Sequence, residues 1–299
     1  MWARRVDDLN YLPKDLEILE QRLCRHGSTS IYTEDSLNQL FQSHLGAGGS
    51  RTRAILALVA GHELNVPSEI RYILATTVEL LHQASLIHDD IQDNDALRRG
   101  QASVWTVAGE SAAICLGDNL IAAAFEELAK LPSTFMHKLP RLINLSSAAI
   151  SRMAAGQTLD CQWRADSQVN FNQYEQIVMH KSGPLLGLPI ALVAEIYNTS
   201  DNCNHSVMAA ASRIGVAYQL ADDLSDRFED QGMRLNGFWV LAEQSMSETE
   251  AEQTLRQEFE HQLTQARQHI NELPDFCLQA FDVLITALLE KYPAFKAAA

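Results

Sequence analysis

The chain has 299 residues, and its composition of 46% hydrophobic and 20% charged residues is that of a folded globular protein. Its formal net charge of −15 argues against a nucleic-acid partner, which requires a basic face. The five cysteines are odd in number and lack CxxC spacing, so they predict neither a disulfide framework nor a zinc site.

The first residues, Met1 to Asp8, lack the apolar core of a signal peptide. No run of the chain approaches the ~20 apolar residues that span a bilayer. The cysteine pattern favours a reducing compartment. We therefore expect a cytoplasmic protein with no transmembrane segment, which would meet an apolar substrate in solution or at a membrane surface.

Apolar residues recur at spacings of three and four, and β-branched alternation is nearly absent, so we expect helices almost throughout. Ser247 to Glu250 form a capping box that opens an amphipathic helix. Six prolines are expected at or near helix boundaries, where proline is tolerated or ends a helix. The earlier expected helices cover residues 8–25, 34–45, 51–64, 68–92, 109–130, 139–165, 170–182, 186–199 and 205–229. The six prolines are Pro67, Pro132, Pro140, Pro184, Pro189 and Pro274.

No linker, low-complexity tract or short-period repeat divides the sequence. We therefore predict a single all-α domain over residues 1–299, built as a large helical bundle. Two of its helices are apolar nearly all round and end in aspartates, which makes them the expected central members. Their acidic ends would then meet at the mouth of the bundle core.

Each of these two helices ends in a pair of aspartates four residues apart, Asp89 with Asp93 and Asp222 with Asp226. On a helix, residues at this spacing share one face. Like charges this close repel unless a cation compensates them. Mg²⁺ is typically held by one or two carboxylates, with water and substrate phosphate oxygens in its other positions. Two facing pairs would form a magnesium clamp for a diphosphate, although a single DDxxD is more often a solvated surface feature.

Basic residues lie close to the first aspartate pair in this acidic sequence. Arg51 and Arg53 follow the glycine loop Gly46 to Gly49, where backbone N–H groups and a helix N-terminus favour phosphate. Arg98 and Arg99 come five and six residues after Asp93, and could hold diphosphate oxygens or form salt bridges with the neighbouring acids. His82 is two helical turns before Asp89 on the same face, where it can donate a hydrogen bond to a second phosphate.

Three further polar positions accompany the second pair. Residues 156–160 place polar side chains, ending in Asp160, within a long apolar helix, which is unfavourable unless they have partners. Lys181, followed by Ser182, ends another expected helix, where it is either a capping charge or a phosphate ligand. Gln219 precedes Asp222 by one helical turn.

Taken together, these motifs closely resemble those of the trans-isoprenyl diphosphate synthases, the polyprenyl synthetase family. The resemblance covers roughly residues 30 to 230 in the family's order. It rests on Gly48-Gly49-x-Arg51, His82, Asp89 to Asp93, Arg98-Arg99-Gly100, Gly117-Asp118, Gly156-Gln157-x-x-Asp160, Lys181, Gln219 and Asp222 to Asp226.

The resemblance implies an all-α isoprenoid-synthase fold, a helical bundle around a central apolar cavity, usually as a homodimer with three Mg²⁺ ions. In this family the metals ionise an allylic diphosphate, and isopentenyl diphosphate attacks the cation. Divalent metals, arginine and lysine stabilise the departing diphosphate, and a dry apolar cavity protects the carbocation.

The resemblance also implies a role for each matching residue. Asp89, Asp93 and Asp222 are the expected metal ligands, supported by Asp90 and Asp226, and with Lys181 they form the expected catalytic set. Arg98, Lys181 with Ser182, and Gln219 are expected to hold the allylic diphosphate. Arg51, His82 and Arg99 are expected to hold isopentenyl diphosphate.

Two departures from the family pattern affect the second substrate. Ser50 stands where the family has a lysine that binds isopentenyl diphosphate, and residues 227–240 lack the lysines that the family carries there. Each lost charge-assisted contact of ~1.5–3 kcal/mol would weaken binding more than tenfold. A type I terpene cyclase or diphosphate lyase, which needs no isopentenyl diphosphate, and a non-catalytic synthase partner subunit therefore remain alternatives to a prenyltransferase.

Ala84 and Ser85, five and four residues before Asp89, are expected to border the pocket for the isoprenoid tail. Short-chain family members often carry an aromatic residue here, whereas small residues leave the pocket open, as do Ser111 to Ala113 on the presumed opposite wall. We expect tails of C15 or more to fit, and a product of about C20 or longer if elongation occurs.

Overall fold

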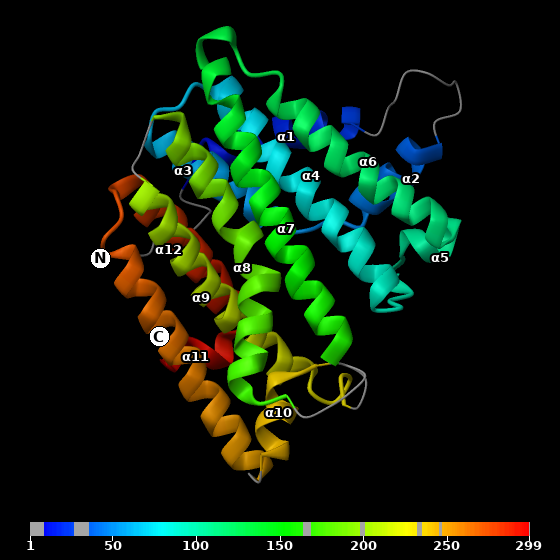
Figure 1. The fold of residues 1–299 in the computed structure, drawn as a ribbon, viewed down its shortest axis with the longest axis vertical. Helices are drawn as coiled ribbons and strands as arrows, with labels where there is room; N and C mark the ends of the chain where they lie inside the picture. Colours follow the sequence, from blue (N-terminus) through cyan, green and yellow to red (C-terminus); the bar gives the residue numbers. More distant parts are fainter. Residues whose placement is uncertain are drawn as a thin grey trace. The chain divides into compact units, whose positions relative to one another are not determined.

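The computed structural model describes residues 9–26, 36–163, 169–197, 201–231, 235–244 and 247–298. These residues form helices and one short two-stranded hairpin, which confirms the all-α class (Figure 1). They divide into two compact units, residues 6–143 and a second that holds residues 144–299. The boundary falls within helix α7 (Leu139–Trp163). A single domain over residues 1–299 stays a prediction.

Helix α4 (Ser68–Gln92) organises the 6–143 unit, and its bounds match the expected ones. It packs against α1, α3, α5 and α6, so 16 of its 25 residues are buried, as expected of a helix that is apolar nearly all round. The other elements of this unit are α1 (Leu12–His26), α2 (Ser36–Gly46), α3 (Thr52–Glu63), α5 (Val104–Ala108), α6 (Glu110–Leu128) and a 3-10 segment (Ser133–Lys138).

A hairpin that the sequence analysis did not predict follows α4. Strand β1 (Leu97–Arg98) pairs antiparallel with β2 (Gln101–Ala102). The two turn residues have positive φ angles, 54° at Arg99 and 78° at Gly100, as a two-residue type I′ turn requires. Glycine adopts this conformation freely, whereas Arg99 adopts it at a cost of roughly 1 kcal/mol. The two arginines at this turn, although adjacent in sequence, have different partners: Arg98 contacts Asp90 and Arg99 contacts Gly48.

Helix α9 (Asp201–Asp226) has the corresponding place in the 144–299 unit, where it packs against α8 and α11. Helix α12, which was not predicted separately, also contacts α9 and ends at Lys291. The elements of this unit after α7 are α8 (Phe171–Ile196), α9, α10 (Gly237–Glu243), α11 (Glu248–Ile270), α12 (Asp275–Lys291) and a 3-10 segment (Pro293–Ala298). The capping box at Ser247 is present, with both of its hydrogen bonds.

The expectation that Pro184 and Pro189 lie at helix boundaries is wrong, because α8 is one continuous helix through both. Residues 183–194 are all buried, and this burial offsets the ~3 kcal/mol that an interior proline costs. Among the described residues, α8 is also the one helix long and apolar enough to cross a membrane, and 78% of its most apolar window is buried inside the fold.

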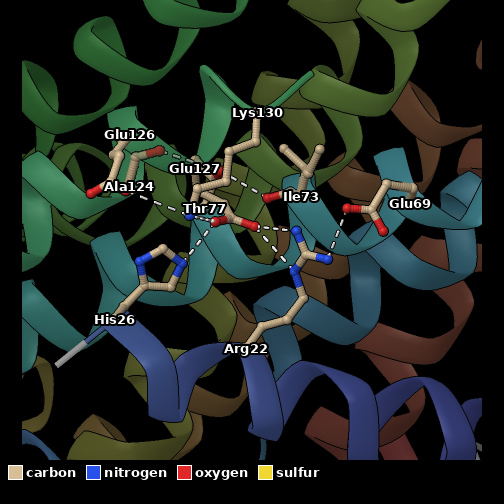
Figure 2. Close-up of polar contacts among 9 residues, drawn as sticks. All are labelled: Arg22, His26, Glu69, Ile73, Thr77, Ala124, Glu126, Glu127 and Lys130. Carbon is tan, nitrogen blue, oxygen red and sulfur yellow. Dashed lines mark hydrogen bonds and ion pairs between the residues drawn. The ribbon is translucent and has the colours of Figure 1, made fainter. Parts of the chain in front are cut away.

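A buried cluster of charges joins α1, α4 and α6 (Figure 2). Glu127, whose side chain is 1% exposed, accepts hydrogen bonds from Arg22 at 2.6 and 3.1 Å, His26 at 2.7 Å and Lys130 at 2.9 Å. Arg22 also reaches Glu69 in the first turn of α4, at 3.0 Å. Burial alone would raise the pKa of Glu127, but its bonds from His26, Lys130 and Arg22 outweigh burial and lower the pKa to about 2.

Replacing Glu127 with alanine is expected to lower the free energy of unfolding by about 3 kcal/mol, because it leaves Arg22 without its buried partner. For the native chain, the Glu127 contribution is complete above pH 4.5, the ordinary pKa, and is lost as the pH falls towards 2. Urea unfolding at several pH values measures both effects. Glu126→Ala, an exposed neighbour, is the control and should change stability by about 0.5 kcal/mol or less. Equal losses in the two variants would contradict a buried cluster.

Candidate functional site

The first aspartate motif lies at the C-terminal end of α4, where Asp93 is the capping residue. Asp89 and Asp93 are half-buried, whereas Asp90 is 1% exposed and accepts hydrogen bonds from Nε and Nη2 of Arg98, the first at 2.7 Å. Arg98 thus forms the salt bridge that was one of its two predicted roles. Asp90 thus fixes Arg98, while a metal-binding role for Asp89 and Asp93 stays a prediction.

A second group of basic residues lies beside the motif. Arg51, at the N-terminus of α3, has a buried guanidinium that pairs with Glu20 at 2.6 Å and Glu79 at 3.4 Å. Arg53 lies 3.0 Å from Nε2 of His82. The predicted substrate ligand Arg51 is therefore held by carboxylates of its own unit, while the Arg53 and His82 side chains contact each other.

His82 is a neutral hydrogen-bond donor in this arrangement. Burial, and then the charges of Arg53, Arg99 and Arg98, lower its pKa well below 6.5. Because an arginine side chain only donates, Nε2 of His82 accepts from Arg53 and Nδ1 carries the proton. Nδ1 is buried and has no hydrogen-bond partner among the described residues. An anion beside His82 would satisfy this donor and compensate the surrounding positive charge.

Arg99 joins this group through the glycine loop before α3. Its Nη1 donates to the carbonyl of Gly48, and a Cβ at Gly49 would lie 2.6 Å from the same atom. Burial, and then the charges of Arg51 and Arg98, lower the pKa of Arg99. Ser50, at the position of the family's lysine, is exposed and bonds to the Thr52 hydroxyl at 2.7 Å.

In the other unit, Lys181 pairs with Asp160 on α7 at 2.7 Å. The expectation that Lys181 ends a helix is wrong, since α8 continues to Ile196. Gly156 permits the close approach of the two helices, because a Cβ there would lie 2.5 Å from the backbone nitrogen of Lys181. Of the polar residues expected to need partners within α7, Asp160 thus meets a lysine. Ser182 is half-buried and its Cβ lies against Gly215 of α9.

Asp223, for which the sequence predicted no role, fixes the second aspartate motif in the fold. It is 2% exposed and accepts hydrogen bonds from Tyr174 at 2.6 Å, the backbone of Gly237 at 2.6 Å and Gln219 at 2.7 Å. Burial raises its pKa to about 7, against the effect of these three donors. The side-chain amide of Gln219, a predicted diphosphate ligand, thus donates its hydrogen bond to Asp223. Sequence spacing relates Asp223 to Gln219, one turn away, but not to Tyr174 or Gly237.

The other two aspartates of the motif, Asp222 and Asp226, are more exposed than Asp223. Asp226 is exposed, and Asp222 is half-buried. Oδ1 of Asp222 accepts a hydrogen bond from the hydroxyl of Tyr292 and pairs with Lys291 at 3.2 Å. Neither Lys291 nor Tyr292 was singled out from the sequence, because they lie about seventy positions downstream of Asp222.

The two residues predicted to limit the tail pocket are both on α4. Ala84 is 1% exposed, and Ser85 is 9% exposed with its hydroxyl donating to the carbonyl of His82 at 2.8 Å. On α6, which packs against α4, Ala113 is fully buried and Ser111 is exposed. Ala113 therefore faces the packed interior, whereas Ser111 does not.

The structure does not by itself gather a metal site from three or more His, Cys, Asp or Glu side chains in the part of the chain it describes. The two aspartate motifs belong to different units. Each motif nevertheless places carboxylates in the last turn of a helix that carries no basic residue there. The negative end of a helix dipole makes this arrangement unfavourable without a cation, so the residues fit a divalent metal.

The sequence is similar to those of known proteins over most of its length. The polyprenyl synthetase family model matches residues 34–235. A short chain isoprenyl diphosphate synthase of Methanocaldococcus jannaschii is 31% identical over 213 residues, which cover 71% of this chain and 64% of that protein. A geranylgeranyl diphosphate synthase of Cyanophora paradoxa is 32% identical over 228 residues, covering 73% of this chain and 74% of the relative. The match thus spans just under two thirds of the first relative.

The fold is also that of solved structures. A polyprenyl synthase from Caulobacter crescentus, complexed with calcium and isoprenyl diphosphate, superimposes with a TM-score of 0.80. The superposition covers 95% of this chain and 97% of that one, at 18% sequence identity.

Proposed function

This chain belongs to the polyprenyl synthetase family, and on that premise we propose that it is a Mg²⁺-dependent trans-prenyltransferase. It would join an allylic prenyl diphosphate to isopentenyl diphosphate and release a longer polyprenyl diphosphate. The observation that carries the proposal is the pair of helix ends, on α4 and α9, where carboxylates lie without a basic residue in the last turn. The names of the two relatives, both synthases of prenyl diphosphates, support it.

In this proposal Asp89, Asp93 and Asp222 hold the metal, with Asp226 in support and three ions in all. Mg²⁺ bound there would act as a Lewis acid that stabilises the departing diphosphate. Asp90 would be a supporting ligand and would also position Arg98, which donates two hydrogen bonds to its Oδ1. A calcium ion accompanies isoprenyl diphosphate in the related Caulobacter crescentus structure, in keeping with a divalent metal.

The remaining polar residues would bind the two diphosphates. Arg98, Lys181 with Ser182, and Gln219 would orient the allylic diphosphate. His82, with its unpartnered Nδ1–H, and Arg99 would take the diphosphate of the second substrate, and Arg53 joins them through its contact with His82. Arg51 would contribute mainly by holding Glu20 and Glu79, since its guanidinium is already paired with both.

One observation favours the alternative of a terpene cyclase or diphosphate lyase. Ser50 supplies no charge where the family has a lysine, and its hydroxyl is hydrogen-bonded to Thr52. Purified protein with Mg²⁺ should be incubated with geranyl, farnesyl or geranylgeranyl diphosphate, with and without isopentenyl diphosphate. Elongated diphosphates support the prenyltransferase, and hydrocarbons or alcohols formed without isopentenyl diphosphate support the alternative. No turnover in any mixture would leave a non-catalytic partner subunit.

Small residues at the proposed tail pocket, which would belong to the expected central apolar cavity, favour a product of about C20 or longer. Ala84→Phe is expected to shorten the product by at least one C5 unit, because the ring fills the space below Asp89. Chromatography of dephosphorylated products measures this, with Ala122→Phe, at an exposed position on α6, as the control. Thermal melts check for overpacking, which costs about 1–3 kcal/mol. An unchanged product length would remove Ala84 from the pocket.

We further propose that the chain acts in the cytoplasm as a homodimer, as the resemblance of its motifs to the family implies. Sedimentation velocity at micromolar concentration tests the dimer, since a monomeric protein with full activity would exclude it as the working form.

A further inference from the structure

The end of α12 places a cation at the second aspartate motif. Nζ of Lys291 lies 3.2 Å from Oδ1 of Asp222 and also contacts the hydroxyl of Tyr218 on α9. The next residue, Tyr292, donates its own hydroxyl to the same Oδ1 of Asp222. The last residue of α12 and the capping residue after it thus contact one carboxylate oxygen that the proposed function assigns to metal binding.

Aromatic rings hold this lysine in place. Nζ lies 4.5 Å from the ring centroid of Tyr218 and 4.7 Å from that of Tyr292, within the range of cation–π attraction. The two rings pack edge to face with centroids 5.6 Å apart. Tyr292 is buried, whereas the Lys291 side chain is 51% exposed. These contacts therefore define where the ammonium group lies, and the exposed half of the side chain leaves it accessible to a ligand.

In the described part of the segment directly after the motif, residues 227–231 and 235–240, the one cation is Arg227, and it is engaged elsewhere. Residues 227–240 contain no lysine. Arg227, its first residue, donates to the carbonyl of Leu224 at 2.8 Å and stacks over the rings of Phe228 and Phe238. The Arg227 guanidinium thus contacts aromatic rings and a backbone carbonyl. Lys291, by contrast, pairs with Asp222, the carboxylate proposed to bind metal.

We propose that Lys291 is a diphosphate ligand of the second aspartate motif, supplied from the far end of the chain. Lys291 neutralises the charge of Asp222 while no metal is bound there. Once a metal occupies Asp222, the ammonium group of Lys291 binds a phosphate oxygen of the substrate. A lysine suits this role because it is a compact charge on a flexible four-carbon stem and binds phosphate without a fixed geometry. The inference rests on the proposed function, because it assumes that Asp222 binds metal beside a diphosphate.

The proposal predicts opposite effects on two ligands, measured by isothermal titration calorimetry. In Lys291→Ala, Mg²⁺ alone should bind as tightly as in the wild type or a few times more tightly, because no ion pair has to be broken. Inorganic pyrophosphate in saturating Mg²⁺ should bind roughly tenfold more weakly, because a charge-assisted contact is lost. Lys291→Arg keeps the charge and should bind pyrophosphate within about threefold of the wild type.

Lys130→Ala is the matched control, because Lys130 is 45% exposed and also pairs with carboxylates, but lies outside the proposed site. It should leave both affinities unchanged. Unchanged pyrophosphate binding in Lys291→Ala, or an equal weakening of Mg²⁺ and pyrophosphate, would overturn the role of Lys291. If the wild type itself binds no pyrophosphate with Mg²⁺, the proposed function fails instead, so the two failures are distinguishable.

Discussion

Asp89→Asn is expected to lower kcat for an allylic substrate by about 10²–10³-fold, because it removes a charge that the proposed mechanism needs in the transition state. Asparagine has nearly the volume of aspartate, and residue 89 is half-buried in the last turn of α4, so the fold should be retained. Steady-state rates at saturating Mg²⁺ and substrate measure the loss. A thermal melt of the same sample verifies that the variant is folded.

Asp275→Asn serves as the control for Asp89→Asn. It is an exposed aspartate in the first turn of α12, outside both motifs, and its replacement should leave kcat unchanged. If Asp89→Asn retained wild-type kcat, the first motif would not hold a catalytic metal. The assignment of Asp93 on the same helix face would then fall with it.

Asp223→Ala is expected to reduce the free energy of unfolding by about 3–5 kcal/mol. The substitution leaves two buried donors, the Tyr174 hydroxyl and the Gly237 amide, and the half-buried Gln219 side chain without their acceptor. It also removes one of the hydrogen bonds that hold the N-terminal end of α10 to α9, since the amide of Gly237 is the first of that helix. Urea denaturation followed by circular dichroism measures the change.

The contrast with Asp226→Ala makes this prediction specific. Asp226 belongs to the same motif but is exposed, so its removal should change stability by about 0.5 kcal/mol or less while lowering activity. Aspartates three residues apart would thus separate into a folding role and a catalytic role. Similar stabilities for Asp223→Ala and Asp226→Ala would show that the buried hydrogen bonds of Asp223 contribute little.

Local patterns in the sequence predicted those parts of the fold and site that depend on neighbours in the chain. The bounds of α4 follow from its apolar run after Pro67, and the capping box at Ser247 marks the start of α11. The spacing of Asp89 and Asp93 likewise follows from the helical repeat alone. Each of these signals lies within a few residues of the feature it specifies.

Local sequence patterns do not predict contacts between residues that are distant in the chain. Lys181 meets Asp160 because Gly156 lets α7 and α8 approach, and Lys291 meets Asp222 across 69 positions. The hairpin at Arg99 was missed because an arginine with positive φ contradicts its usual preference. The continuity of α8 was missed because burial overrides the local effect of proline.

The two prolines inside α8 also determine how its unit can fold. Without their N–H groups the helix lacks two backbone hydrogen bonds, and it carries glycines that lie against Ser212 and Met208 of α9. Such a segment has little helical stability by itself, so its helix and its packing on α9 must form in one cooperative step. Loss of that packing would release the Tyr174–Asp223 bond between α8 and α9, so the integrity of this core is coupled to the anchoring of the second aspartate motif.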